Sequence, residues 1–300
     1  MKTLTVLDPP RWLPPSAWPW QTQLLSHGRD RIAVTDTGQG APLVFVHVGS
    51  WSFVWRDVLL RLQNDFRCVT IDAPGCGLSD RVSTPPTLAH AGDAVTAVID
   101  ALQLRDFTLV AHDLGGPAGF LAAARRADRL AALAAVNCFA WKPTGPGFRG
   151  MLALMGSAPV RELDAATDVL SRVTSTSFGV GRHWSRADRA VFRAGIDVSA
   201  RRAWHAYFRD ARSAEALYAE VDVALRGPLA DRPLLTIFGE LNDPLRFQPR
   251  WKALFPAAHQ LKVRRGNHFP MCDDPDLVAR ALKSFVHQHL PSSPVDLRES

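Results

Sequence analysis

The chain has 300 residues, 47% hydrophobic and 21% charged, which suffices for one large packed domain or for a domain that carries an insertion. The formal net charge is +6, but basic residues occur singly or in short pairs such as Arg125-Arg126, which argues against nucleic-acid binding. The first 20 residues lack the apolar core of a signal peptide, and no run approaches the ~20 apolar residues of a membrane helix. We therefore expect a cytoplasmic protein without nucleic-acid or membrane partners, its four cysteines reduced and not metal-bound.

The first half of the chain alternates between short apolar runs and helical patterns. Residues 1–30, rich in proline and tryptophan near their start, are expected to form an N-terminal arm on the surface. Strands are predicted from apolar runs bounded by turn residues, at 31–37, 43–48, 67–72, 107–112 and 130–136. Helices are predicted where apolar residues recur three or four apart, at 55–62, 88–102 and 114–126. Gly38-Gln39-Gly40 provides a tight reversal between the first two strands.

The pattern changes after Trp141, where helical periodicity and many arginines replace the buried strands. From residue 228 the alternation resumes, with strands expected at 233–239 and 260–263 and helices at 249–255 and 276–289. This organisation predicts one core domain, residues 31–141 and 228–300, interrupted by a helical insertion over residues 142–227. The expected fold class is α/β, with a mostly parallel sheet flanked by helices.

The stretch FTLVAHDLGGPAG places Asp113 between an apolar strand and a glycine-rich helix start. Such a corner holds its central side chain at the carboxyl end of the sheet, above unpaired N–H groups of the helix. A serine there attacks acyl carbons, whereas a carboxylate is suited to displacement at a saturated carbon and forms an ester on the enzyme. The alternative interpretation is that Asp113 only caps the helix.

Two more polar residues follow strands in the second half of the chain. Asp243, in FGELNDP, comes just after a predicted strand, and His268, in GNHFP, lies in the loop before the last helix. Each alone is compatible with an ordinary turn or loop residue. In chain order, however, Asp113, Asp243 and His268 follow the nucleophile–acid–histidine order of α/β-hydrolase triads. We therefore predict that these three side chains meet.

Five segments together resemble one family: VHVGSWSFVWRDVL, IDAPGCGLSD, VAHDLGGPAG, IFGELNDP and GNHFP. Over about residues 31–290 the chain is similar to α/β-hydrolases with an aspartate nucleophile, the group of haloalkane dehalogenases and epoxide hydrolases. The resemblance implies the α/β-hydrolase fold, with residues 142–227 as a cap domain over the active site. It also implies a small hydrophobic organic substrate and water as reactants, with no cofactor and no metal.

The mechanism implied by the resemblance passes through an ester on Asp113. His268 would activate the water that hydrolyses this ester, and Asp243 would bond the far ring nitrogen of His268 and stabilise the imidazolium. Part of the group carries a carboxylate where this chain has Asn137. An amide cannot stabilise an imidazolium equally, so we expect Asn137 to be a hydrogen-bonding residue of the substrate pocket.

The backbone N–H groups of Leu114 and of Val48 or Gly49 would hold the oxyanion. The segment that contains Val48 and Gly49 is one residue shorter than the family's His-Gly-x-Pro and lacks its proline. Dehalogenases of this group carry tryptophan directly after the nucleophile, where this chain has Leu114, so a side-chain donor for halide must come from elsewhere. The candidate indoles, each of which alternatively serves only in packing, are Trp51, Trp141, Trp184 and Trp204.

Epoxide opening requires acidic hydroxyl groups, and two cap tyrosines supply them in that part of the family. This chain has two tyrosines, Tyr207 and Tyr218, but the position that resembles a catalytic tyrosine is Phe208. We expect Tyr207 and Phe208 in the substrate pocket. The leading interpretation is a haloalkane dehalogenase-like hydrolase, with an epoxide hydrolase as the alternative and a non-hydrolytic or ligand-binding member of the fold as the third possibility. Whether the protein is a monomer or a homo-oligomer stays open.

Overall fold

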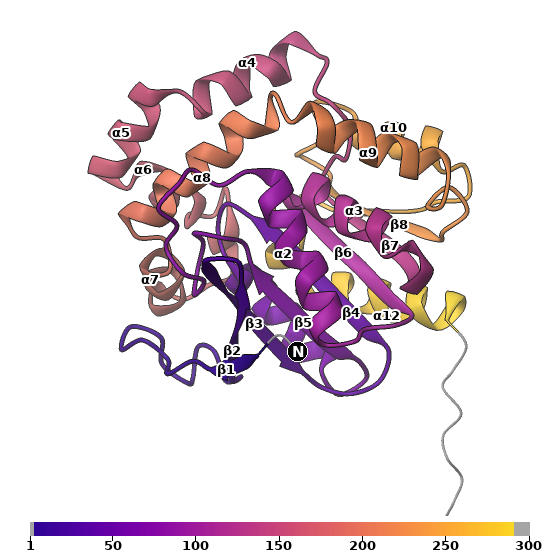
Figure 1. Cartoon of the computed structure of the whole chain (residues 1–300), viewed down its shortest axis with the longest axis horizontal. Coiled ribbons are helices and arrows are strands. Elements are labelled where there is room, and N and C mark those ends of the chain that lie inside the picture. The colour runs from indigo at the N-terminus through magenta and orange to yellow at the C-terminus, as the bar shows by residue number, and fades with distance from the viewer. Residues whose placement is uncertain (1–2, 291–300) are drawn as a thin grey trace, which may run out of the picture.

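The computed structural model describes residues 3–290 and consists of a central sheet with helices on both faces (Figure 1). Within these residues nine strands form one sheet in the order β1-β2-β3-β5-β4-β6-β7-β8-β9. The ladders from β5 through β9 are parallel, and those that join β1, β2, β3 and β5 are antiparallel. The strands are β1 (Leu4–Val6), β2 (Thr22–His27), β3 (Asp30–Thr37), β4 (Pro42–Val48), β5 (Arg67–Asp72), β6 (Phe107–Asp113), β7 (Leu130–Val136), β8 (Leu234–Gly239) and β9 (His259–Val263). The mostly parallel sheet expected from the sequence is confirmed.

The centre of the sheet is formed by the most apolar strands. In β4 every residue after Pro42 is buried, and in β6 only the last residue, Asp113, is partly accessible. A continuous apolar run suits this position because helices cover both faces of a parallel sheet. Figure 1 shows α2 and α3 in front of the sheet and α12 behind it. The helices and 3₁₀ turns of the core are η1 (Ser52–Trp55), α1 (Arg56–Leu62), α2 (Leu88–Ala101), α3 (Gly115–Arg125), η2 (Ala127–Arg129), α10 (Phe247–Leu254), α11 (Pro270–Asp273) and α12 (Pro275–His289).

Two features of the sheet differ from the expectation. The strands predicted at 31–37 and 43–48 form as β3 and β4, but they are not neighbours, because β5 lies between them. A glycine turn predicts a reversal of the chain, whereas the order of strands depends on how the apolar faces pack. In addition, β1 and β2 precede residue 31 and belong to the same sheet, so the sheet extends beyond the predicted start of the core.

The segment between β7 and β8 contains the helices α4 to α9, which we call the cap helices. They are α4 (Pro146–Met155), α5 (Ala158–Thr167), α6 (Val169–Thr174), α7 (Arg186–Ala194), α8 (Val198–Ala211) and α9 (Glu215–Arg226), with the 3₁₀ turn η3 (Val180–Arg182) before α7. Helix α8 packs against α4 and α5 of this segment and against α2 of the core. The arm, core and cap boundaries remain predictions from the sequence.

A buried polar cluster connects three of the cap helices. The ring of His205 in α8 lies 2.5 Å from the carbonyl oxygen of Met155 and 3.0 Å from the carboxylate of Asp164 in α5. Both ring nitrogens therefore face acceptors. Burial acts to raise the pKa of Asp164, but hydrogen bonds from His205 and from the N–H of Leu170 outweigh it and leave this pKa below its usual value. The side chains of the pair are 0% and 1% exposed.

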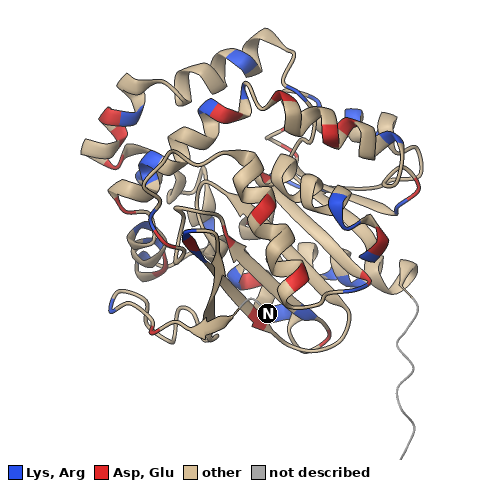
Figure 2. Ribbon diagram, in the orientation of Figure 1, with Lys and Arg blue, Asp and Glu red and all other residues tan. Residues whose placement is uncertain are grey.

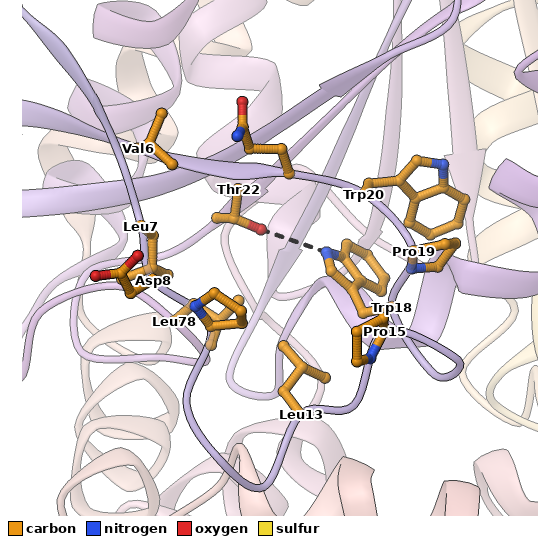
Figure 3. Close-up of a pocket in the computed structure, with 12 residues that line it drawn as sticks. Val6, Leu7, Asp8, Leu13, Pro15, Trp18, Pro19, Trp20, Thr22 and Leu78 are labelled. Carbon is orange, nitrogen blue, oxygen red and sulfur yellow. Dashed lines mark hydrogen bonds between the residues drawn. The ribbon is translucent and has the colours of Figure 1, made fainter.

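The tryptophan-rich arm lies against the core. Leu13 and Trp18 are buried, and the indole N–H of Trp18 donates to the hydroxyl of Thr22 over 3.3 Å. Figure 3 shows these side chains beside a hollow of about 330 Å³, with Leu78 of the core on its other side. The rings of Trp12 and Trp18 also contact Trp51, which precedes η1. The arm thus covers part of the core's aromatic surface.

Charged residues of both signs are interspersed over the elements of the molecule (Figure 2). Several form surface pairs, such as Arg31 with Asp80 and Arg226 with Asp222. Exposed pairs of this kind contribute little to stability, typically ~0–1 kcal/mol each. In the part of the chain that the structure describes, no helix combines the length and the apolar character needed to cross a bilayer.

Candidate active site

Asp113 stands at a strained corner between β6 and α3. Its φ of 52° lies in the left-handed region that side chains other than glycine rarely adopt. The close approach of neighbouring backbone requires glycine after it: a Cβ on Gly115 would lie 2.6 Å from the carbonyl oxygen of Val46, and one on Gly116 would lie 2.1 Å from that of Phe139. The corner that the sequence predicts therefore forms, and it presents the Asp113 carboxylate at the carboxyl end of the sheet.

His268 lies opposite Asp113, in the loop between β9 and α11. Its Nε2 is 3.6 Å from Oδ2 of Asp113, and the two side chains are 32% and 19% exposed. Burial acts to raise the pKa of Asp113, but the charge and hydrogen bonding of His268, with the N–H of Leu114, outweigh it and leave this pKa below its usual value. The carboxylate is therefore ionised at neutral pH.

The far side of the His268 ring contacts Asn242, which differs from the expectation. Nδ1 of His268 lies 3.0 Å from Oδ1 of Asn242. Asp243, the expected partner, instead accepts hydrogen bonds from the backbone N–H groups of Phe247 (2.6 Å) and Gln248 (3.1 Å), at the start of α10. The physical reason is that a helix N-terminus has unpaired N–H groups that a nearby carboxylate satisfies. A carboxylate was expected at this place because it would stabilise an imidazolium, so the amide of Asn242, one residue earlier, was not predicted.

Asn137 holds the loop that carries His268. Its Oδ1 accepts from the N–H of Gly239 over 3.0 Å, which fixes the orientation of the amide. Its Nδ2 then donates to the carbonyl oxygens of Asn267 and His268, both at 3.0 Å, and lies 3.4 Å from Oδ1 of Asn242. This arrangement keeps an oxygen of Asn242 facing His268, so Nδ1 of His268 donates to that oxygen while Nε2 faces Asp113.

Two buried histidines connect the His268 loop to the segment after β4. His112 has one ring nitrogen 2.8 Å from the carbonyl oxygen of His268 and the other 2.9 Å from His47. The second nitrogen of His47 accepts from the N–H and the hydroxyl of Ser50, at 3.2 and 2.5 Å. These contacts give each ring a single proton. Burial, followed by the charge of His268, lowers the pKa of His47 to about 3 and that of His112 well below its usual value, so both rings are neutral.

A cavity of about 350 Å³ opens beside Asp113 and His268. One wall belongs to α4 of the cap, and the others come from loops at the carboxyl ends of β7 and β8. Apolar residues predominate in its lining, and Arg and Lys do not occur there. The lining residues are Asp113, Asn137, Phe139, Gly147, Phe148, Met151, Phe238, Asn242, Asp243, Pro244, Leu245, Phe247 and His268. Such a cavity suits a neutral, apolar ligand.

The backbone groups expected to hold an oxyanion lie next to Asp113. Val48 is the ladder partner of Asp113 between β4 and β6, and Gly49 follows it with φ +109°. A Cβ on Gly49 would lie 2.1 Å from Nε1 of Trp204, so the indole N–H of this cap residue sits directly over the segment. Trp204 is 3% exposed, and its Nε1 has no hydrogen-bond partner within residues 3–290. Unpaired buried donors are rare in folded proteins, and the indole of Trp55 is the other unpaired indole among the described residues. Trp204 is not among the residues that line the cavity of about 350 Å³.

The other candidate indoles have their own contacts. Trp51 donates to the carbonyl oxygen of Phe192 over 2.9 Å, and Trp184 donates to the carboxylate of Asp57 over 2.8 Å. The ring of Trp141 has a guanidinium 4.2 Å from its centroid. These tryptophans, unlike Asn137, are absent from the lining of the cavity. Packing and hydrogen bonding to the protein account for their positions.

Both tyrosines of the cap are bonded to backbone carbonyl groups. The hydroxyl of Tyr207 donates to Pro74 over 2.8 Å, and that of Tyr218 donates to Ala211 over 2.7 Å. Burial raises the pKa of each phenol above its usual value. Phe208 stacks on an indole of the same helix and, like Tyr207, does not line the cavity. Neither tyrosine therefore presents a free hydroxyl to the site.

Comparison with known proteins supports the assignment of the fold and the class of enzyme. Residues 43–281 match the model of the alpha/beta hydrolase family. Haloalkane dehalogenase 2 of Mycobacterium tuberculosis is 28% identical over 278 residues, which are 89% of this chain and 96% of that protein. A cis-3-alkyl-4-alkyloxetan-2-one decarboxylase of Shewanella oneidensis is 29% identical over 287 residues, 89% of each chain.

Solved structures have the same fold. A haloalkane dehalogenase from Agrobacterium tumefaciens superposes with a TM-score of 0.76 at 22% identity, covering 90% of this chain and 97% of that one. An epoxide hydrolase superposes with a TM-score of 0.74 at 18% identity, covering 89% and 98%. The resemblance inferred from the five sequence segments is thereby confirmed. This chain belongs to the alpha/beta hydrolase family and is an enzyme of the type represented by the haloalkane dehalogenases.

Proposed function

We propose that this protein cleaves carbon–halogen bonds in small apolar molecules through an ester on Asp113. The observation that carries the proposal is the ionised Asp113 carboxylate at the strained corner, with Nε2 of His268 at 3.6 Å and an apolar cavity beside both. A carboxylate in such surroundings is suited to attack on a saturated carbon. The absence of arginine and lysine from the lining favours a neutral substrate.

The reaction has two steps. An oxygen of Asp113 forms a bond to the substrate carbon while the carbon–halogen bond breaks, and the halide leaves with the bonding electrons. His268 then takes a proton from water, and the hydroxide adds to the carbonyl carbon of the ester. We assign the N–H groups of Leu114 and Gly49 to the resulting oxyanion. When this intermediate collapses, the alcohol leaves with a proton from His268, and the Asp113 carboxyl group then releases the remaining proton of the water to solvent, which restores the carboxylate.

Trp204 is the donor that we assign to the departing halide. Leu114 has no side-chain donor, and the indole N–H of Trp204 is buried, lies over Gly49 and lacks an acceptor among the described residues. A developing halide would supply the missing acceptor. This assignment supports halide as the leaving group, because Trp51 and Trp184 already bond to protein acceptors.

A single turnover in heavy-oxygen water tests the ester route. With a panel of bromoalkanes, chloroalkanes and epoxides, label should enter the carboxylate of Asp113, and bromide or chloride should be released. The His268→Gln variant should accumulate an alkyl ester on the peptide that contains Asp113. An unlabelled Asp113 peptide, obtained while the substrate is being consumed, would contradict the proposal.

Epoxide opening is supported less well than dehalogenation. It requires a proton donor for the ring oxygen, and the hydroxyls of Tyr207 and Tyr218 already donate to backbone carbonyl groups. The same panel addresses this alternative, because an epoxide hydrolase would release a diol. A cytoplasmic location and the absence of nucleic-acid and membrane partners stay predictions from the sequence.

A non-hydrolytic reaction is the second candidate, and Asn242 favours it. The decarboxylase among the relatives acts, by its name, on a four-membered lactone. On this chain Asp113 would attack the saturated ring carbon and break its bond to the ring oxygen, which becomes a carboxylate. Loss of carbon dioxide would then form the alkene and expel the Asp113 carboxylate. Neither water nor a base takes part in this reaction, so His268 need not become an imidazolium. The uncharged amide of Asn242 beside it would therefore not slow the reaction. Detection of alkene from a cis-dialkyl β-lactone tests this candidate.

A further inference from the structure

The base of the proposed reaction is surrounded mainly by uncharged groups. Nδ1 of His268 bonds to the amide of Asn242, and its backbone carbonyl accepts from Asn137 and from the neutral ring of His112. The carboxylate that lies within 4 Å of the ring nitrogens of His268 is that of Asp113, whose Oδ2 is 3.6 Å from Nε2. An imidazolium in this site therefore depends on the nucleophile itself for its counter-charge.

This counter-charge disappears during the proposed reaction. Once Asp113 has become an ester it is neutral, and the imidazolium that forms when His268 takes a proton from water has lost its partner. Asp243 cannot turn to replace it without breaking two hydrogen bonds to the start of α10. The base is therefore weakest at the step in which it is needed.

We propose that Asn242 is a positioning residue whose uncharged amide aims His268 but leaves it a weak base after Asp113 has been esterified, so that ester hydrolysis limits turnover. This inference rests on the proposed function. The amide preserves the tautomer, because Asn137 keeps an oxygen of Asn242 facing Nδ1. A carboxylate at the same place would preserve the tautomer and also stabilise the imidazolium.

Other charged groups near His268 do not substitute for such a carboxylate. Asp273 of α11 accepts from the backbone N–H of Asn267 over 2.5 Å and lies 3.2 Å from the guanidinium of Arg182. His47 and His112 are neutral. The titratable groups that bear on His268 are therefore Asp113 and His112 of β6, His47 of β4, Asp243 before α10, Asp273 of α11 and Arg182 of η3.

Rapid-quench kinetics with bromohexane test the proposal on the unmodified protein. We expect a burst of one bromide per Asp113, followed by slower steady release, and an alkylated Asp113 peptide during the steady state. Ester hydrolysis should be followed as a function of pH, because the midpoint of this profile reports the basicity of His268 in the alkylated protein. A burst and a persistent ester support the proposal, whereas hydrolysis faster than alkylation overturns it.

The Asn242→Asp variant supplies the missing charge. We expect ester hydrolysis roughly tenfold faster or more, since an opposite charge at hydrogen-bond distance typically raises a histidine pKa by about one unit or more. The midpoint of its pH profile should move upward, and the rate of alkylation should change little. A merely structural role for Asn242 would leave the midpoint in place. A folded variant with unchanged midpoint and hydrolysis overturns the proposal.

The matched control is Asn64→Asp, which adds the same charge on an exposed residue of the turn after α1, away from the site. It should leave ester hydrolysis unchanged, and an equal acceleration would overturn the specific role of Asn242. If Asn242→Asp fails to fold, the burst of the unmodified protein decides the question. Failure of the proposed function has a different signature, namely no alkylated Asp113 in the unmodified protein and none in His268→Gln.

Discussion

The two sides of the proposed reaction centre differ in how their polar atoms are satisfied. On the core side, Asn137, His112 and Asn242 form a continuous set of hydrogen bonds around His268. On the cap side, the buried indole N–H of Trp204 has no acceptor in residues 3–290. The polar groups around His268 are therefore satisfied within the protein, whereas the indole of Trp204 is not. In the proposed reaction the core supplies the nucleophile and the base, and the cap supplies the hydrogen-bond donor for the leaving group.

Buried histidines show a second contrast between the same regions. In the core, His47 and His112 bond to each other and each has one proton. In the cap, His205 has two acceptors and pairs with the carboxylate of Asp164. The core cluster thus contains no buried charge, whereas the cap cluster contains the buried carboxylate of Asp164, which accepts from His205. Removal of one member of the cap pair should therefore destabilise the protein strongly.

The largest expected effect is on chemistry at the core side. Asp113→Asn should reduce halide release by roughly 10⁴-fold or more, because the neutral amide cannot displace the leaving group. Release of bromide from a bromoalkane measures the effect. Asp106→Asn is the matched control, since Asp106 is exposed, has a φ of 50° and undergoes the same substitution. Comparable loss in both variants would contradict the assignment of the nucleophile.

The next largest effect concerns the stability of the cap cluster. Asp164→Leu should lower the free energy of unfolding by about 3–5 kcal/mol, because it leaves the buried ring of His205 without its carboxylate partner. The double variant Asp164→Leu/His205→Leu should recover much of this loss, since it removes both members of the pair. Urea unfolding, monitored by circular dichroism, measures both. If the double variant is as unstable as the single one, the pair is not the source of the loss.

A smaller effect on catalysis tests the role of Trp204 in the cap. Trp204→Phe should slow release of chloride by roughly 10- to 100-fold, because a hydrogen bond to a charged acceptor contributes ~1.5–3 kcal/mol. The better leaving group, bromide, should be affected less. Trp184→Phe serves as the control, because that indole already donates to Asp57. Equal slowing of chloride and bromide release would argue for a packing role of Trp204.

The smallest expected effect is a dependence of stability on pH that arises from the core histidine His47. The pKa of His47 is about 3 in the folded protein against a usual 6.5, so the unfolded chain binds more protons between these values. Stability should therefore fall as the pH drops from 6.5 toward 3, by at most about 1.4 kcal/mol per pH unit for this histidine. Unfolding midpoints at pH 7 and pH 5 test this, and His47→Gln should reduce the dependence. Replacement of the exposed His259 by asparagine, the control, should leave the pH dependence of stability unchanged.

Much of the fold followed from the sequence because local patterns determine it. The apolar runs of β4, β6 and β8 and the glycines after Asp113 specify buried strands and a tight corner without reference to distant residues. The order of β3, β5 and β4 was not predictable, because it depends on packing across the whole sheet.

The candidate site was predictable only in part. Asp113 and His268 lie where strand ends place them, and the structure brings them together. Whether Asn242 or Asp243 becomes the partner of His268 depends on where α10 begins. The free N–H groups at the start of this helix bind the carboxylate of Asp243 and keep it away from the histidine. The role proposed for Trp204 depends on the lack of a hydrogen-bond acceptor for its indole N–H in the folded protein. Sequence spacing carries no information about this.

The arm is connected to the cap through contacts between tryptophan rings. Trp12 and Trp18 contact Trp51, and Trp51 in turn bonds to the carbonyl oxygen of Phe192 in α7. A fragment that begins at Arg31 would therefore lose the tryptophans that contact Trp51 below the cap helix α7. It would also lose the strands β1 and β2 at one edge of the sheet. Any trimming of this enzyme for use should spare its first thirty residues.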